Sequence, residues 1–231
     1  GTSNPAKGFE IWKTDAKGKP PYRWERVMKH GAFRYNLNHT ASTLTEFKDH
    51  LYISSALPGL GQDKEENIGP AAAELLWLDA QGNWDLLVGT TRFTADGMKF
   101  PLSLKGPVFE DAENSLFWAI ASHDGVLYAG SHNNTTWRHA LAGDAELKGG
   151  FHLWGTADGE TWEPISVDGF GDPFSVGIRT MISTPHGLFF GTLNHRDIEK
   201  IWFLRTGRRE QAAGEGGFDI FRAPSASASP D

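Results

Sequence analysis

Short apolar runs alternate along this chain with short polar turns, and the arrangement recurs. Three runs are anchored on a leucine followed by an aromatic residue, and an apolar residue stands seven positions before each leucine. The pairs are Leu51-Tyr52, Leu127-Tyr128 and Leu188-Phe189, and the preceding apolar residues are Leu44, Ile120 and Met181. Because a polar turn separates the two apolar runs each time, each segment predicts a β-hairpin.

Each predicted hairpin is followed by two further strands. The third strand has the form Gly-Phe-x-Ile-Trp or a looser version of it, and the fourth begins at a tryptophan after a second short turn. The third strands lie at residues 8–12, 73–78, 150–154 and 217–221, and the fourth begin at Trp24, Trp84 and Trp162. Repeated four-stranded antiparallel units are the pattern of β-propeller blades. We therefore predict an all-β chain with a β-propeller fold, and a sandwich or an irregular β-solenoid is the alternative.

The predicted blades are incomplete at both ends of the sequence. Residues 1–4 match residues 130–133 and 191–194, but the apolar strand that precedes the two later copies is missing from the first. We therefore expect a fragment of a longer propeller over residues 1–223, with two full four-stranded blades and two partial ones. Residues 224–231 are rich in serine, alanine and proline, which predicts a disordered, low-complexity tail.

Composition agrees with a β-rich protein and narrows its partners. The chain has 27 glycines for tight turns, and 9 tryptophans and 15 phenylalanines that suit sheet faces. A net charge of -7 argues against nucleic acid or an anionic membrane as the main partner. No apolar run approaches the roughly 18 residues of a membrane-spanning helix. The absence of cysteine excludes disulfides, thiolate nucleophiles and cysteine-ligated metals. Without cysteines the sequence does not distinguish a secreted from a cytoplasmic location.

The turn between the third and fourth predicted strands carries a motif. Residues 156–162, Thr-Ala-Asp-Gly-Glu-Thr-Trp, resemble the Asp-box of sialidase-type (BNR-like) propellers, one residue shorter than the usual form. Looser copies contain Asp15 and Asp79. In that family the box is structural, which implies that the aspartate caps the turn, the glycine takes a positive φ and the tryptophan packs between sheets. Sialidase activity is not implied, because the sequence offers no convincing arginine triad or Tyr-Glu pair.

Two other segments carry a fainter resemblance. Residues 67–75 and 96–103 resemble segments of large bacterial propeller proteins. Some cyanobacterial enzymes that alkylate aromatic rings in natural-product assembly are similar in having a propeller domain. Their catalytic residues do not match residues of this chain one by one, so the resemblance implies a bacterial propeller and only adds an enzyme to the possible functions.

The connections between the predicted strands are unequal in length. Turns inside the hairpins and between the third and fourth strands are short, whereas second-to-third and blade-to-blade connections are long. In an antiparallel blade both long connections emerge at the same end of the strands. Because long loops of compact domains are usually functional or disordered, we expect the ligand site at this end, at the rim of a central channel.

Six residues at that end are the predicted ligand-binding set. Arg34, Tyr35, Asn38 and His39 crowd one long connection, and such side chains suit a sugar or a carboxylate. Trp118 and Arg179 occupy equivalent positions of two first strands, which should line the channel. The alternatives are a loop that satisfies its own backbone hydrogen bonds and, for Arg179, a structural salt bridge.

Secondary candidates are an acidic cluster, a Trp-Arg pair and three dispersed histidines. The acidic cluster suits Ca²⁺ or an acid/base pair, the Trp-Arg pair a stacked sugar, and the histidines a metal only if the fold brings them together. These residues are Glu110, Asp111 and Glu113; Trp137 and Arg138; and His39, His132 and His195. The alternatives are that the acidic cluster is only solvated charge and that Trp137 only covers the edge of a sheet. We therefore predict no metal ligand, and no cofactor other than the Ca²⁺ alternative.

These patterns predict a propeller that binds an oligosaccharide or another polar or anionic small molecule at its loop-rich face. One alternative is the propeller domain of an enzyme, glycoside-processing or from natural-product biosynthesis, with its site at the channel mouth and catalytic residues unassigned. The other is a protein-interaction scaffold. The expected macromolecular partners are the remainder of its own longer chain or a second copy, which would associate through the incomplete blades.

Overall fold

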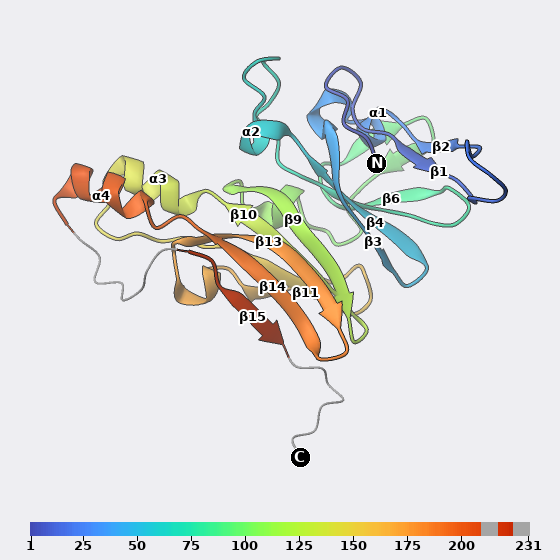
Figure 1. Cartoon of the computed structure of the whole chain (residues 1–231). Helices are drawn as coiled ribbons and strands as arrows, with labels where there is room; N and C mark the ends of the chain where they lie inside the picture. Colours follow the sequence, from blue (N-terminus) through green and yellow to red (C-terminus); the bar gives the residue numbers. More distant parts are fainter. Residues whose placement is uncertain (209–216, 224–231) are drawn as a thin grey trace. The chain divides into compact units, whose positions relative to one another are not determined.

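Antiparallel strand pairs between sequence neighbours dominate the structure (Figure 1). The computed structural model describes residues 1–208 and 217–223, so the tail expected at 224–231 lies outside the described residues. The chain divides into two compact units, Gly1–Phe117 and Trp118–Asp231, and each has its own apolar core.

The first unit contains a strand pair and a complete four-stranded meander. The pair is β1 (Ile11–Lys13) and β2 (Glu25–Met28), and the meander runs in sheet order through β3 (Thr40–Phe47), β4 (His50–Ala56), β5 (Leu75–Leu78) and β6 (Trp84–Val88). Alternate residues of a strand point to opposite faces, and apolar residues of both sheets meet in one core. Phe9, Met28, Ile53, Leu76 and Trp84 belong to this core.

The second unit contains another complete meander and a three-stranded one. The first is β9 (Asn114–His123, which begins just before the unit boundary), β10 (Val126–Asn133), β11 (Leu153–Thr156) and β12 (Glu163–Ser166); the second is β13 (Ser175–Thr184), β14 (Gly187–Asn194) and β15 (Ile220–Ala223). One residue pair between β10 and β13, His132 with Gly177, joins them into one sheet. Phe151, Ile178 and Phe190 lie in a core to which both meanders contribute.

These meanders confirm the all-β propeller-type fold and its two full and two partial blades. Strand order, hairpin positions and the short turns agree with the pattern read from the sequence. The register agrees as well, because Trp118 and Arg179 are each the fifth residue of a ten-residue first strand.

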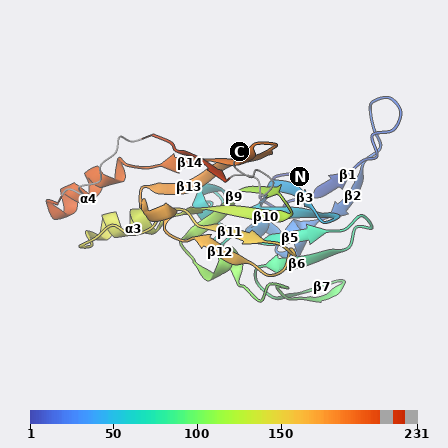
Figure 2. The same ribbon diagram turned by 90° about the horizontal axis from the view of Figure 1, so that it is seen from below.

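The long connections carry short helices and a small hairpin. They contain α1 (His30–Phe33), η1 (Tyr35–Asn38), α2 (Pro58–Gly61), the hairpin β7 (Arg92–Thr94) and β8 (Gly97–Lys99), η2 (Pro107–Glu110), α3 (Thr135–Ala142), η3 (Gly169–Gly171) and α4 (Ile198–Thr206). In Figures 1 and 2, α3 and α4 lie side by side at the end of β10 and β14 opposite the hairpin turns. None of the described helices has both the length and the apolar character needed to cross a membrane.

The helices α3 and α4 lie outside the repeated strand pattern that the sequence shows. Both begin and end inside second-to-third strand connections, so each is too short to show a long apolar period. They are held by a shared apolar cluster that includes Ala140, Phe174, Ile198 and Trp202. Tertiary packing, rather than local pattern, therefore stabilises these helices.

The connection after β6 returns along the outer side of that strand. Leu102 donates its backbone N–H to the Leu86 carbonyl at 3.0 Å, and Gly89 donates to the Lys105 carbonyl at 3.2 Å. Val88 and Lys105 form a parallel bridge. The return segment, residues 101–105, thus pairs with β6 on the side away from β5.

The turn before β12 is capped by Asp158. Its carboxylate accepts hydrogen bonds from the backbone N–H groups of Glu160 and Thr161 at 2.8 and 2.7 Å, and Gly159 has a φ of 96°. Burial on its own would raise the pKa of Asp158, but these hydrogen bonds to the carboxylate hold it well below its usual range. Asp79 accepts comparable bonds from Gln81 and Asn83. The geometry suits a structural turn, while membership of the Asp-box family stays a prediction.

We expect Asp158→Ala to lower the free energy of unfolding by about 0.5–2 kcal/mol, by analogy with helix caps, because two turn N–H groups lose their acceptor. The folded-state pKa is depressed, so this stabilisation is complete above the unfolded pKa of roughly 3.9 and declines as the pH falls below it. Urea unfolding of both proteins at neutral and acidic pH measures the difference. A difference that does not shrink below that pH would contradict the capping role.

The tryptophans that follow these turns do not all pack as expected. Trp84 and Trp162 are 6% and 2% exposed, but Trp24 is 55% exposed. Only one turn N–H, that of Lys17, is bonded to the Asp15 carboxylate among the described residues. The segment between Asp15 and Trp24 is longer than the corresponding segments before Trp84 and Trp162, and it does not form the tight turn that positions those two rings. The expected burial of Trp24 is therefore wrong.

Candidate functional site

Trp118 and Arg179, two of the predicted binding residues, lie together in the second unit. Trp118 projects from β9 and Arg179 from β13, and the guanidinium carbon of Arg179 lies 4.6 Å from the centre of the Trp118 ring. Gly177 permits this approach, because a Cβ there would lie 2.9 Å from Trp118 ring atoms. The equivalence read from the repeat thus corresponds to a direct cation–π contact.

The charge of Arg179 is not neutralised by a neighbouring carboxylate. The side chain is exposed, and among the described residues it forms no ion pair. The structural salt bridge considered as its alternative is therefore absent from the described part of the chain. A guanidinium fixed over an indole can present its planar N–H groups to a carboxylate or phosphate.

His132 also contacts Trp118. Its ring contacts the indole edge to face, with centroids 5.1 Å apart, and its side chain is almost fully buried. Burial, together with repulsion from nearby His195, lowers the pKa of His132 to about 4. The imidazole is therefore neutral at pH 7, and Arg179 supplies the positive charge of this cluster.

His195 and Trp137 form a second pair of rings, and His195 is close enough to His132 to interact with it electrostatically. Trp137, in α3, meets His195 edge to face at 5.8 Å, and the Nδ1 atom of His195 is buried with no hydrogen-bond partner among the described residues. We refer to Trp118, His132, Trp137, Arg179 and His195 as the Arg179 cluster. It combines stacking surfaces, one available cation and a buried polar atom.

Arg34 and Asn38, also predicted binding residues, lie in the first unit around buried Glu74. Asn38 donates to one Glu74 oxygen at 2.8 Å, and the Arg34 Nε lies 3.7 Å from the other. Arg92 forms an ion pair with Glu74 at 3.0 Å, and the Thr90 N–H donates at 2.8 Å. Burial lowers the pKa of Arg34, while the Glu74 carboxylate opposes that shift. These contacts match the alternative of an internally bonded loop; a ligand-binding role stays a prediction.

Tyr35 and His39 have different surroundings in the same connection. Tyr35 is 52% exposed and stacks on His30, with ring centroids 5.5 Å apart. His39 is buried, and its Nδ1 has no hydrogen-bond partner in the described part of the chain. Tyr35 is thus the member of this predicted set that faces solvent most openly.

The acidic residues after η2 form a local turn. The Asp111 carboxylate accepts the N–H of Glu113 at 2.9 Å, and the Asp111 carbonyl accepts that of Asn114 at 3.0 Å. Within residues 1–208 and 217–223, no group of three or more histidine, aspartate or glutamate side chains is placed to hold a metal ion. Neither the Ca²⁺ alternative nor the histidine site gains support from this geometry.

Glu74 was not predicted as a site residue. A signal was present, because it is the single charged residue in the apolar run Ala71-Ala72-Ala73-Glu74-Leu75-Leu76. Its partners are Asn38, Arg34 and Arg92, which stand 36, 40 and 18 positions away. Gly89 completes the pocket for the carboxylate, since a Cβ there would lie 2.6 Å from a Glu74 oxygen.

Comparisons with known proteins do not assign the chain to a family. No protein-family model matches the chain, and no curated protein matches it. A solved structure of a candidate gluconolactonase is similar with a TM-score of 0.30 and 13% sequence identity, over 74% of this chain. The match spans 61% of that protein's chain.

Proposed function

We propose that this chain is a ligand-binding propeller module that holds an acidic sugar, or a similar small ring-shaped carboxylate, at the Arg179 cluster. The observation that carries the proposal is the exposed Arg179 guanidinium, which lies over Trp118 and has no carboxylate partner among residues 1–208 and 217–223. A carboxylate can form two parallel hydrogen bonds with such a guanidinium. The aromatic side chains of the cluster can contact the apolar face of a sugar ring.

The surroundings of the cluster support a preference for anions. His132 is neutral at pH 7, so it neither repels Arg179 nor adds a second cation. The chain as a whole is acidic, with a net charge of -7, which disfavours nonspecific anion binding elsewhere. We therefore expect anion binding at the cluster to depend on Arg179. The enzyme and scaffold alternatives stay predictions.

We expect D-glucuronate to bind more tightly than D-glucose, which lacks its carboxylate, and Arg179→Ala to remove the preference. Loss of a charge-assisted bidentate contact should weaken glucuronate binding by about tenfold or more. Arg179→Lys should restore part of it, because an ammonium keeps the charge but not the planar fork. Isothermal titration calorimetry at pH 7 measures the affinity of each of the three proteins for glucuronate and for glucose.

Arg205→Ala is the matched control, because it removes the same charge from an exposed position of α4 in the same unit. It should leave the preference for glucuronate unchanged. Equal affinity of the unaltered chain for glucuronate and glucose, or an equal loss in both variants, would contradict the proposed site.

A further inference from the structure

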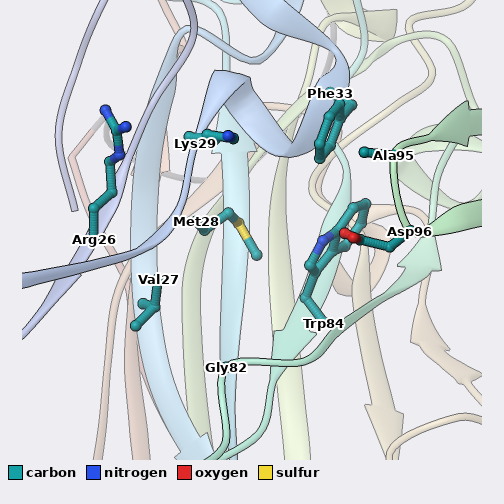
Figure 3. A pocket seen from close by; sticks show the side chains of 9 residues that line it. All are labelled: Arg26, Val27, Met28, Lys29, Phe33, Gly82, Trp84, Ala95 and Asp96. Atoms are coloured by element: carbon teal, nitrogen blue, oxygen red, sulfur yellow. The ribbon is translucent and has the colours of Figure 1, made fainter.

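A separate cavity of about 280 Å³ opens in the first unit, between the end of β2, the start of β6 and the β7–β8 hairpin (Figure 3). Its apolar surface comes from Met28, Phe33 and Trp84, and the two aromatic rings are nearly parallel, 6.4 Å apart. Ligand pockets for drug-sized molecules usually measure about 300–1,000 Å³, so this cavity suits a smaller molecule with a flat apolar body.

Two exposed side chains of opposite charge, Lys29 and Asp96, lie in the cavity wall. Among the described residues, neither the Lys29 ammonium nor the Asp96 carboxylate forms an ion pair or a side-chain hydrogen bond. In Figure 3, the Asp96 side chain lies beside Trp84, and the Lys29 side chain lies away from it, between Arg26 and Phe33 in this view. The apolar surface therefore lies between a free cation and a free anion.

The other charged side chains near the cavity form contacts within the protein. Arg26 pairs with Glu10 at 2.7 Å, and Lys99 pairs with Asp85 at 2.7 Å. The Lys99 ammonium also lies 5.0 Å from the centre of the Trp84 ring, and Arg92 lies 5.7 Å from it. Because protein cations already use the Trp84 ring, a ligand ammonium is favoured at Asp96 rather than over the indole.

We propose that this cavity binds a small zwitterion whose ammonium and carboxylate stand at opposite ends of a flat apolar body. The ammonium pairs with Asp96, the carboxylate pairs with Lys29, and the body packs against Met28, Phe33 and Trp84. A ligand with one charge makes one charge-assisted contact instead of two and therefore binds more weakly. The inference goes beyond the acidic-sugar site, since it involves different residues in the other unit.

The test uses 4-(aminomethyl)benzoate and two analogues of the same shape. 4-Methylbenzylamine lacks the carboxylate, and 4-methylbenzoate lacks the ammonium. Calorimetric titration of the whole chain at neutral pH should show that the zwitterion binds about tenfold more tightly than either analogue.

Substitution of each charge should then give opposite selectivities. Lys29→Met should weaken binding of the zwitterion and of 4-methylbenzoate by about tenfold and leave binding of 4-methylbenzylamine unchanged. Asp96→Asn should weaken binding of the zwitterion and of 4-methylbenzylamine by about tenfold and leave binding of 4-methylbenzoate unchanged. Lys19→Met and Glu65→Gln, at exposed positions outside the cavity, are the controls and should change nothing.

Three results would overturn the inference. The first is that the zwitterion does not bind at about millimolar concentration. The second is that the three compounds bind with equal affinity, and the third is that each variant weakens binding of all three compounds equally. Thermal unfolding of each variant verifies that it is folded. The glucuronate titration of Arg179 variants is unaffected by any of these results, so the two sites fail or succeed separately.

Discussion

Glu74→Gln should lower the free energy of unfolding by about 3–5 kcal/mol, because it removes one partner of a buried ion pair and leaves the other charge uncompensated. The Glu74 side chain is fully buried, and those of Arg34 and Arg92 are 13% and 11% exposed. Glutamine keeps the size of the side chain, so the loss reports charge rather than a cavity. Urea unfolding followed by circular dichroism gives the difference.

Glu10→Gln is the matched control for this prediction. It removes the carboxylate of the Glu10–Arg26 pair, whose arginine side chain is 44% exposed and whose separation, 2.7 Å, is shorter than that of Glu74 and Arg92. Solvent screens this pair, so its loss should be much smaller. Equal losses at Glu74 and Glu10 would show that Glu74 is not the counter-ion of a buried network.

Trp162→Ala should cost about 3–5 kcal/mol of stability, the range for large-to-small changes at buried aromatic residues. The side chain is 2% exposed and lies directly before β12, after the turn that Asp158 caps. Truncation removes apolar packing and leaves a cavity that neighbouring strands can fill only in part. The free energy of unfolding in urea is again the measurement.

Trp24→Ala serves as the control, since Trp24 precedes β2 at the corresponding place of the repeat but is 55% exposed. It should change stability far less than Trp162→Ala. A loss below roughly 1 kcal/mol for Trp162→Ala, in a chain that folds, would place this ring at a site that can collapse or that is open to solvent.

The repeat explains why much of the strand order could be predicted. Leu51, Leu127 and Leu188 each lie near the start of a second strand, and the residues seven positions earlier lie in the first strand of the same hairpin. A repeated unit transfers its register from one copy to the next. For the same reason the sequence related Trp118 to Arg179, although it did not predict that the two side chains touch.

The Glu74 network and the zwitterion cavity could not be predicted in this way. Arg34 and Arg92 lie in connections that differ between the repeats, so no second copy indicates where they fold. The cavity exists because the β7–β8 hairpin brings Asp96 to the side of Trp84, twelve positions earlier in the sequence. Such contacts depend on how irregular segments pack, which apolar periodicity does not encode.

The return segment along β6 bears on how this protein avoids edge-to-edge aggregation. An open outer strand offers unpaired N–H and C=O groups to any passing chain. In the first unit, residues 101–105 already occupy the outer side of β6. In the second unit, β12 ends its sheet and contains Pro164, which has no N–H to donate. Both complete meanders thus resist growth at their fourth strand, one by covering the edge and the other by removing a donor from it.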